Sequence, residues 1–95
     1  MPAIALSFPN ESRSYDATRG CVRFWGHDSA LEISFFVHAS ALCKLRPQTV
    51  DSGADDGEAA FLAAFDEARA RILEVAIKAY KRRPDYAFVL LASDF

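Results

Sequence analysis

Residues 21–37 carry two runs of alternating apolar and polar side chains, separated by the short polar stretch HDSA at 27–30. Alternation with a period of two is typical of β-strands, because successive side chains point to opposite sides of a sheet. Aspartate and serine in the break favour a tight turn. The pattern therefore predicts a β-hairpin with strands at 21–26 and 31–37.

A turn centred on residues 28 and 29 predicts that Val22 pairs with Phe35 and Phe24 with Ile33. One side of the hairpin is then wholly apolar and suited to a core. A four-residue loop gives the same division. The opposite side is mixed in character, and its candidates for an interaction or binding surface are Arg23, Trp25, His27, Glu32, Phe36 and His38.

The segments around the hairpin predict two further strands and two polar connections. Residues 4–8 alternate before a proline and suit a short edge strand. Residues 10–20 are rich in turn-forming side chains and are expected to be a loop, and residues 48–57 are expected to be a polar linker. Residues 86–92 predict a strand that is apolar on both faces and needs cover on both.

Two segments are expected to be helical. Residues 38–47 predict a short helix that Ser40 caps and Pro47 stops. From 58 to about 83, apolar residues recur at helical spacing, with acids at the start and bases at the end, as the helix dipole favours. Pro84 ends this long helix, which we expect to cover the apolar side of the sheet.

The 95 residues suffice for a single domain, 1–95, with one core. The expected fold is α+β: an antiparallel sheet of about four strands, one long helix packed on one face and one short helix. The long helix covers only one layer, so Trp25 and Phe36 on the second face need other cover. Two solutions stay open: an intrachain lid from the short helix or the loop with Tyr15, or a second subunit.

Composition excludes general disorder, since 52% of the residues are hydrophobic and 25% charged. The net charge of −2 provides no overall basic field for nucleic acid. The first residues lack the regions of a signal peptide, and the longest apolar run, 59–65, is far too short to cross a membrane. We expect a cytoplasmic protein in which Cys21 and Cys43 are reduced thiols.

No residue pattern indicates a catalytic centre, a metal site or a cofactor. His27 beside Asp28 suits a turn better than acid–base chemistry, because Asp bonds backbone amides in turns. His38 and Ser40 lack an orienting third group and a nucleophile elbow. Cys21 is expected to be a buried structural thiol. The histidines and carboxylates are too scattered to bind one metal ion.

The end of the long helix, KAYKRR, carries basic side chains that suit contacts with phosphates. A single terminal cluster is a small electrostatic footprint, and the acids at the other end make the helix a dipolar rod. Nucleic-acid binding is therefore the weakest of the functional interpretations. Its candidate residues are Lys78, Lys81, Arg82 and Arg83.

Five motifs together resemble a known family: LSFPN (6–10), SRSYD (12–16), VRFWGHD (22–28), LEISFFV (31–37) and LLASDF (90–95). They are similar to a family of small bacterial proteins catalogued as domain of unknown function number 1488. The resemblance runs over almost the whole chain. It implies a compact α+β domain in the bacterial cytoplasm and implies no activity, cofactor or catalytic residue.

These observations favour a non-enzymatic interaction or regulatory module over an enzyme. We expect it to self-associate as a dimer, or to bind another protein, through the hairpin side that carries Trp25. A dry, apolar centre would indicate such an interface, whereas water-accessible ionisable groups would indicate a site. The alternative is therefore a small-ligand-binding or catalytic protein with an open patch formed by Arg23, Trp25, His27, Glu32 and His38.

Overall fold

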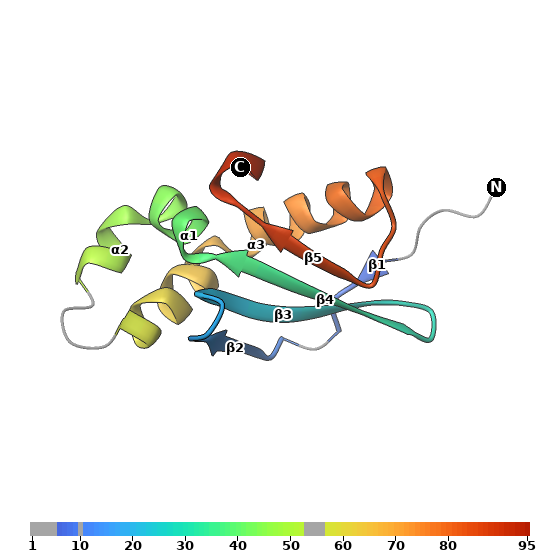
Figure 1. The fold of residues 1–95 in the computed structure, drawn as a ribbon, viewed down its shortest axis with the longest axis horizontal. Coiled ribbons are helices and arrows are strands. Elements are labelled where there is room, and N and C mark those ends of the chain that lie inside the picture. The colour runs from blue at the N-terminus through green and yellow to red at the C-terminus, as the bar shows by residue number, and fades with distance from the viewer. Residues whose placement is uncertain (1–5, 10, 53–56) are drawn as a thin grey trace.

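The fold is α+β, as expected, with one five-stranded sheet beside one long helix (Figure 1). A computed structural model describes residues 6–9, 11–52 and 57–95. The elements, in chain order, are β1 (Leu6–Ser7), β2 (Arg13–Asp16), β3 (Cys21–Asp28), β4 (Leu31–His38), α1 (Ala39–Leu45), α2 (Pro47–Ser52), α3 (Gly57–Arg82), β5 (Ala87–Leu90) and the 3-10 helix η1 (Ala92–Asp94).

The sheet is mostly antiparallel and has β3 and β4 at its centre. Both β1 and β2 pair with β3 along one edge, and β5 pairs with β4 at the other. β5 runs parallel to β4. The connection through α1, α2 and α3 returns the chain to the end of the sheet where β4 begins, and β5 starts there. Figure 1 shows that α3 runs along one side of the sheet and that β5 is the outermost strand of the sheet on one edge.

The hairpin turn is tighter than predicted. β3 continues to Asp28 and β4 begins at Leu31, so only Ser29 and Ala30 connect them. Ser29 adopts a positive φ of 55°. Positive φ values are typical of two-residue hairpin turns, whose twist matches that of the strands.

The turn is also centred one residue later than predicted, on Ser29 and Ala30, and this shifts the pairing of the hairpin strands. Val22 pairs with Val37 and Phe24 with Phe35, so the predicted partners Phe35 and Ile33 are wrong. The shift is by two residues, and the pleat of a strand also repeats every two residues. Each side chain therefore stays on the face where the sequence pattern predicted it.

α3 supports the apolar face of the sheet and agrees closely with the predicted helix at 58–83. The ring centroids of Phe65 on α3 and Phe24 on β3 are 5.2 Å apart, and Phe24 stacks on Phe35 at 5.2 Å. Such aromatic contacts add to the stabilisation from burial. The buried residues of α3 lie along one face of the helix: Ala60, Ala64, Phe65, Ala68, Ile72, Val75, Ala76 and Tyr80.

Two predicted connections contain regular structure. The loop expected at 10–20 includes β2, where Tyr15 points to α3 and its ring stacks on Phe61 with centroids 5.5 Å apart. The linker expected at 48–57 is helical up to Ser52, because Pro47 begins α2 instead of only ending α1. Positions 53–56 of that linker lie outside the described residues, and Gly57 begins α3. Proline suits the first turn of a helix, where its missing N–H has no intrahelical partner to lose.

Three element boundaries also differ from the predictions. The N-cap of α1 is His38 and not Ser40, because the His38 side chain accepts a hydrogen bond from the Ser40 backbone N. The strand expected at 86–92 is shorter, since η1 follows β5. Of the strand expected at 4–8, positions 4 and 5 lie outside the described residues, and β1 covers the next two.

Candidate functional site

The side of the sheet turned away from α3, here called the open face, carries all six residues predicted to form a surface. Their side chains come from alternate positions of β3 and β4, so the pleat places them on one side. β5 adds two residues in register with them. The open face consists of Arg23, Trp25, His27, Glu32, Ser34, Phe36, His38, Ala87 and Val89.

Phe36, which was expected to need cover, is covered by two arginine side chains of the same chain. The Arg19 Cζ lies 4.5 Å from the centroid of the Phe36 ring, and the Arg23 Cζ lies 5.7 Å from it. Phe36 is only 7% exposed. A guanidinium stacked on an aromatic ring shields the ring while its own edge stays available for hydrogen bonds. Phe36 therefore adds little to the apolar surface that the open face exposes to water, and that surface comes from its neighbours.

Arg23 is the most constrained polar residue of the open face. Its Nη2 donates to the Ser34 Oγ at 3.2 Å, and its Cζ lies 4.9 Å from the centroid of the Trp25 ring. Its Nε is buried and has no hydrogen-bond partner within the described part of the chain. A buried donor without an acceptor costs about 1–3 kcal/mol, a cost that the contacts of Arg23 with Ser34 and Trp25 must offset.

The two histidines lie at opposite ends of the hairpin and do not form a common centre. His27 pairs with Glu32 near the turn, whereas His38 pairs with Cys21 at the far end. The His38 Nδ1 is 3.1 Å from the Ser40 backbone N and 2.8 Å from the Ser40 Oγ, which engages it in capping α1. Within residues 6–9, 11–52 and 57–95, no group of three or more His, Cys, Asp or Glu could hold a metal ion.

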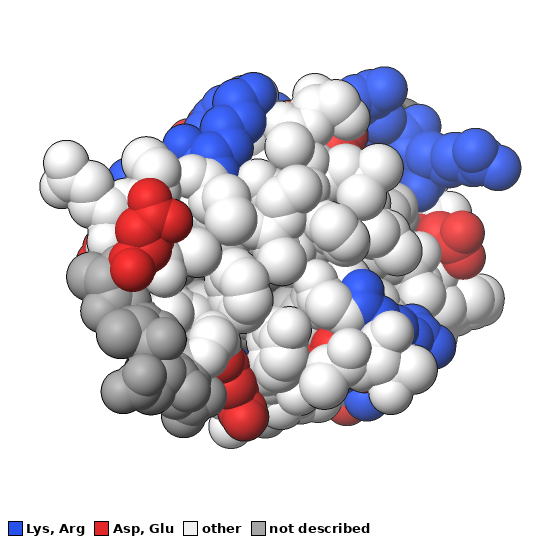
Figure 2. Space-filling model, turned by 60° about the vertical axis from the view of Figure 1, so that its left-hand side comes forward, with Lys and Arg blue, Asp and Glu red and all other residues white. Residues whose placement is uncertain are grey.

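An apolar strip crosses the open face from β3 to β5. Half-buried Trp25 lies beside Ser34 on β4, and Ser34 lies beside Ala87 on β5. Val89, next to Phe36, is 56% exposed. Figure 2 shows that the molecular surface includes a broad uncharged area with charged side chains at its margins. Trp25 and Val89 are the large apolar side chains of this strip that water still reaches.

Three of the four cations predicted at the end of α3, namely Lys78, Arg82 and Arg83, line two neighbouring hollows, and Lys81 lines neither. The Lys78 Nζ lies 3.5 Å from the Glu74 Oε1. Arg82 and Arg83 line a hollow beside β5, and Lys81 does not line it. Nucleic-acid binding through these four cations stays a prediction.

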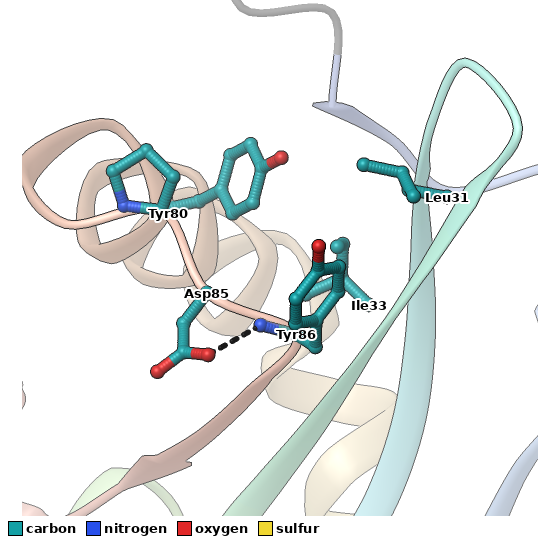
Figure 3. Close-up of a pocket in the computed structure, with 6 residues that line it drawn as sticks. Leu31, Ile33, Tyr80, Asp85 and Tyr86 are labelled. Atoms are coloured by element: carbon teal, nitrogen blue, oxygen red, sulfur yellow. Dashed lines mark hydrogen bonds between the residues drawn. The ribbon is translucent and has the colours of Figure 1, made fainter.

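A small pocket of about 190 Å³ lies between the hairpin turn and the end of α3 (Figure 3). The Asp85 carboxylate accepts a hydrogen bond from the Tyr86 backbone N at 2.7 Å, so it is engaged locally. The pocket is lined by Leu31, Ile33, Tyr80, Pro84, Asp85 and Tyr86.

The described helices include none that is long and apolar enough to cross a membrane.

Tyr80 at this pocket forms a contact that the sequence analysis missed. Its hydroxyl donates to the Asp28 Oδ2 at 2.6 Å, which ties α3 to the hairpin. The hydrogen bond to Asp28, followed by burial, raises the pKa of Tyr80. Asp28 had been assigned to a local turn bond. The only signal in the sequence was that a tyrosine on the apolar stripe of a helix needs a partner for its hydroxyl.

Cys21 is a packed thiol, as expected. It is 3% exposed, and its Sγ lies 3.4 Å from the Arg19 carbonyl oxygen. Burial raises the pKa of the Cys21 thiol, the charge of Asp16 raises it further, and Arg19 opposes both. Because the thiolate is the nucleophile, a raised pKa argues against a catalytic role for Cys21. Cys43 is free and exposed on α1.

Comparisons with known proteins identify the family of this chain. The family described as "Protein of unknown function (DUF1488)" matches residues 6–90. The fold is similar to the crystal structure of a protein of unknown function from the same family of Shewanella loihica PV-4, with a TM-score of 0.76, 17% sequence identity, and coverage of 95% of this chain and 96% of that one. A search of curated proteins finds no match. The chain belongs to the DUF1488 family of proteins of unknown function.

Proposed function

We propose that this protein is a non-enzymatic interaction module that self-associates through the open face, with a second copy of the chain as the occupant. The observation that carries the proposal is the apolar strip. Trp25 remains partly exposed beside two small side chains, Ser34 and Ala87, and Val89 is 56% exposed. Partly exposed aromatic residues in such a setting are typical anchors of protein interfaces.

The shape of the strip favours a second copy over an unrelated protein. In a two-fold interface the same surface serves both subunits, so a protruding residue needs a receiving surface on the same face. Trp25 supplies the large side chain, and the small side chains are Ser34, which Arg23 contacts, and Ala87 on β5. Two open faces packed in opposite directions place each Trp25 over the small side chains of the other copy.

The charges of the open face are also self-complementary. Arg23 lies on the open face and forms no ion pair with the described residues. Glu32 is exposed and forms no ion pair with the described residues. A face that carries unpaired groups of both signs can satisfy them in a two-fold dimer, which fixes the relative orientation of the subunits.

A small-ligand or catalytic role for the open face receives less support. Such a role needs Arg23, His27, Glu32 and His38 to converge, but His38 caps α1 at one end while His27 lies at the other. Arg23 is held by Ser34 and by its stacking. The ionisable groups are therefore spread along the open face and do not meet at one point.

The test is to measure mass by sedimentation and Trp25 emission over about a hundredfold range of protein concentration, because dimers dissociate on dilution by mass action. We expect a dimer whose Trp25 emission shifts to the red as it dissociates. Val89→Asp places a charge in the strip and should give a monomer at all concentrations. The matched control is Leu31→Asp, since Leu31 is 46% exposed but belongs to the other side of the sheet.

The control should behave as the unmodified protein does. A monomer at every concentration would overturn the proposal, whether the Trp25 emission is that of an exposed or a buried indole. Dissociation by Leu31→Asp but not by Val89→Asp would place the interface on the opposite side of the sheet and would equally overturn it.

A further inference from the structure

Within the described part of the chain, β5 leaves two residues with unpaired backbone groups at the edge of the sheet. The Ser34 backbone N donates to the Tyr86 carbonyl oxygen, which fixes the parallel ladder between β4 and β5. In a parallel pair, alternate residues turn both backbone groups toward the neighbouring strand. Phe88 therefore pairs with β4, while the N–H and C=O groups of Ala87 and Val89 point away from the sheet.

This free edge is bounded by two aspartates. The Asp85 Oδ1 accepts from the Tyr86 backbone N at 2.7 Å, and the Asp94 Oδ2 accepts from the Leu91 backbone N at 2.7 Å. Natural sheets usually protect an edge strand with charges, proline or a covering segment. The sequence of β5, AFVL, contains none of these side chains. The open backbone groups are thus confined to the length of β5.

A basic groove adjoins the free edge on its α3 side. Two neighbouring hollows of about 210 and 190 Å³ share Ala79, Arg82 and Asp94. The Asp94 carboxylate is held by the Leu91 backbone N, and Glu74 pairs with Arg71 and Lys78. Among the described residues, Arg82 and Arg83 form no ion pair. The cations that line the two hollows are Arg71, Lys78, Arg82 and Arg83.

We propose that β5 binds an extended, acidic segment of another protein, which adds a strand to the free edge and places its carboxylates in the groove beside Arg82 and Arg83. Strand addition is an established mode of peptide recognition, in which backbone hydrogen bonds give affinity and alternate side chains give specificity. This surface lies at the edge of the sheet, so the inference goes beyond the self-association through the open face.

The two sides of β5 define the side-chain pattern of the segment. Phe88 and Leu90 point to the α3 side, where the arginines lie, whereas Ala87 and Val89 point to the open face. Side chains of an added strand alternate in the same way. The segment should therefore alternate acidic residues, over the groove, with apolar residues, over the open face.

Neither a second copy nor a nucleic acid fits this edge as well. Pairing of β5 with the β5 of another copy offers no carboxylate from its AFVL sequence and brings two pairs of Arg82 and Arg83 together. A nucleic acid would be attracted by every nearby cation, including Lys81, which lies outside the groove. An acidic strand alone satisfies both the backbone groups and the arginines.

The experiment uses fluorescence anisotropy with the full chain and a labelled peptide of about eight residues that alternates glutamate and valine. Arg82→Glu should weaken binding by at least about tenfold, because it reverses a charge in the groove. The matched control, Lys81→Glu, makes the same charge change at the next position and should alter affinity by less than about twofold. Val89→Pro removes an outward N–H that the sheet itself does not use and should also weaken binding by about tenfold.

Several results would overturn this inference. One is absence of binding up to about 1 mM peptide, and another is equal binding of a peptide that alternates lysine and valine. Equal losses for Arg82→Glu and Lys81→Glu, together with binding to a single-stranded oligonucleotide, would identify a nucleic-acid surface instead. A dimer that dissociates only on Val89→Pro, without peptide binding, would show that the edge pairs with a second copy. Two-dimensional NMR spectra of the backbone amides of each variant establish that the fold is retained.

Discussion

Gly26 lies in the buried row of β3, at a place where two segments approach closely. A Cβ atom at this position would lie 2.8 Å from the Phe8 Cε1, 3.0 Å from the Leu6 Cδ1 and 3.3 Å from the Phe35 Cε2. The contact at 2.8 Å is closer than packed carbon atoms tolerate, and the other two are tight enough that the Leu6 and Phe35 side chains would have to shift slightly. The absence of a side chain at Gly26 is therefore what allows β1 and its neighbouring Phe8 to close over the end of the core.

We expect Gly26→Ala to destabilise the protein by about 1–3 kcal/mol, since an added methyl group in a packed core forces its neighbours to move. Urea unfolding at neutral pH measures the loss. Gly57→Ala is the control, because the nearest described atom to a Cβ there is the Phe61 Cε2, at an ordinary contact distance of 3.9 Å, and the change in stability should be less than about 0.5 kcal/mol. Equal losses for both variants would show that close approach at Gly26 is not the cause.

At this scale the sequence predicts which face a residue occupies but not what it contacts. Arg23 and Trp25 were placed correctly because the pleat alone decides their side of the sheet. The stacking of Arg23 on Phe36 depends on side-chain conformations that alternation does not encode. The contact of Tyr80 with Asp28 joins residues 52 positions apart, and no local pattern specifies it.

At the scale of elements, β2 shows how tertiary contacts create a strand that local composition hides. Its residues, RSYD, are small or polar and suit a loop. They nevertheless alternate, with Arg13 and Tyr15 on the α3 side. Tyr15 stacks on Phe61, and Arg13 forms two hydrogen bonds with Asp66, at 2.9 and 2.8 Å. The long helix was predictable because its own periodicity is strong, whereas β2 depends on a partner distant in the sequence.

The Arg13–Asp66 pair should therefore control the local stability of β2. Asp66→Asn removes the charge that Arg13 and Arg69 share, and we expect faster amide hydrogen exchange in β2 with little change in β3 and β4. The global loss should be only about 0.5 kcal/mol, because the pair is partly exposed. Glu67→Gln is the control, since Glu67 contacts Arg46 instead. Exchange that accelerates equally in β2 and β4 would contradict the local role.

At the scale of the molecule, two titratable contacts join α3 to the sheet from different parts of the helix. Asp66 and Tyr80 lie on successive parts of α3, in a molecule of 48 × 22 × 21 Å. The hydrogen bond from Arg13, which outweighs the effect of burial, lowers the pKa of Asp66 from its ordinary 3.8. The hydrogen bond to Asp28 raises the pKa of Tyr80 from its ordinary 10.0. The two shifts have opposite signs, so they act at opposite ends of the pH range.

Their signs predict the pH profile of the free energy of unfolding. A lowered pKa means that the contribution of Asp66 is present above pH 3.8 and is lost as the pH falls through its folded-state value. A raised pKa means that the contribution of Tyr80 is present below pH 10.0 and is lost as the pH rises through its folded-state value. Urea unfolding midpoints measured across the pH range should therefore fall at both ends. Asp66→Asn should weaken only the acid decline and Tyr80→Phe only the alkaline one. An alkaline decline that Tyr80→Phe leaves unchanged would show that the Tyr80–Asp28 contact does not link the helix to the hairpin energetically.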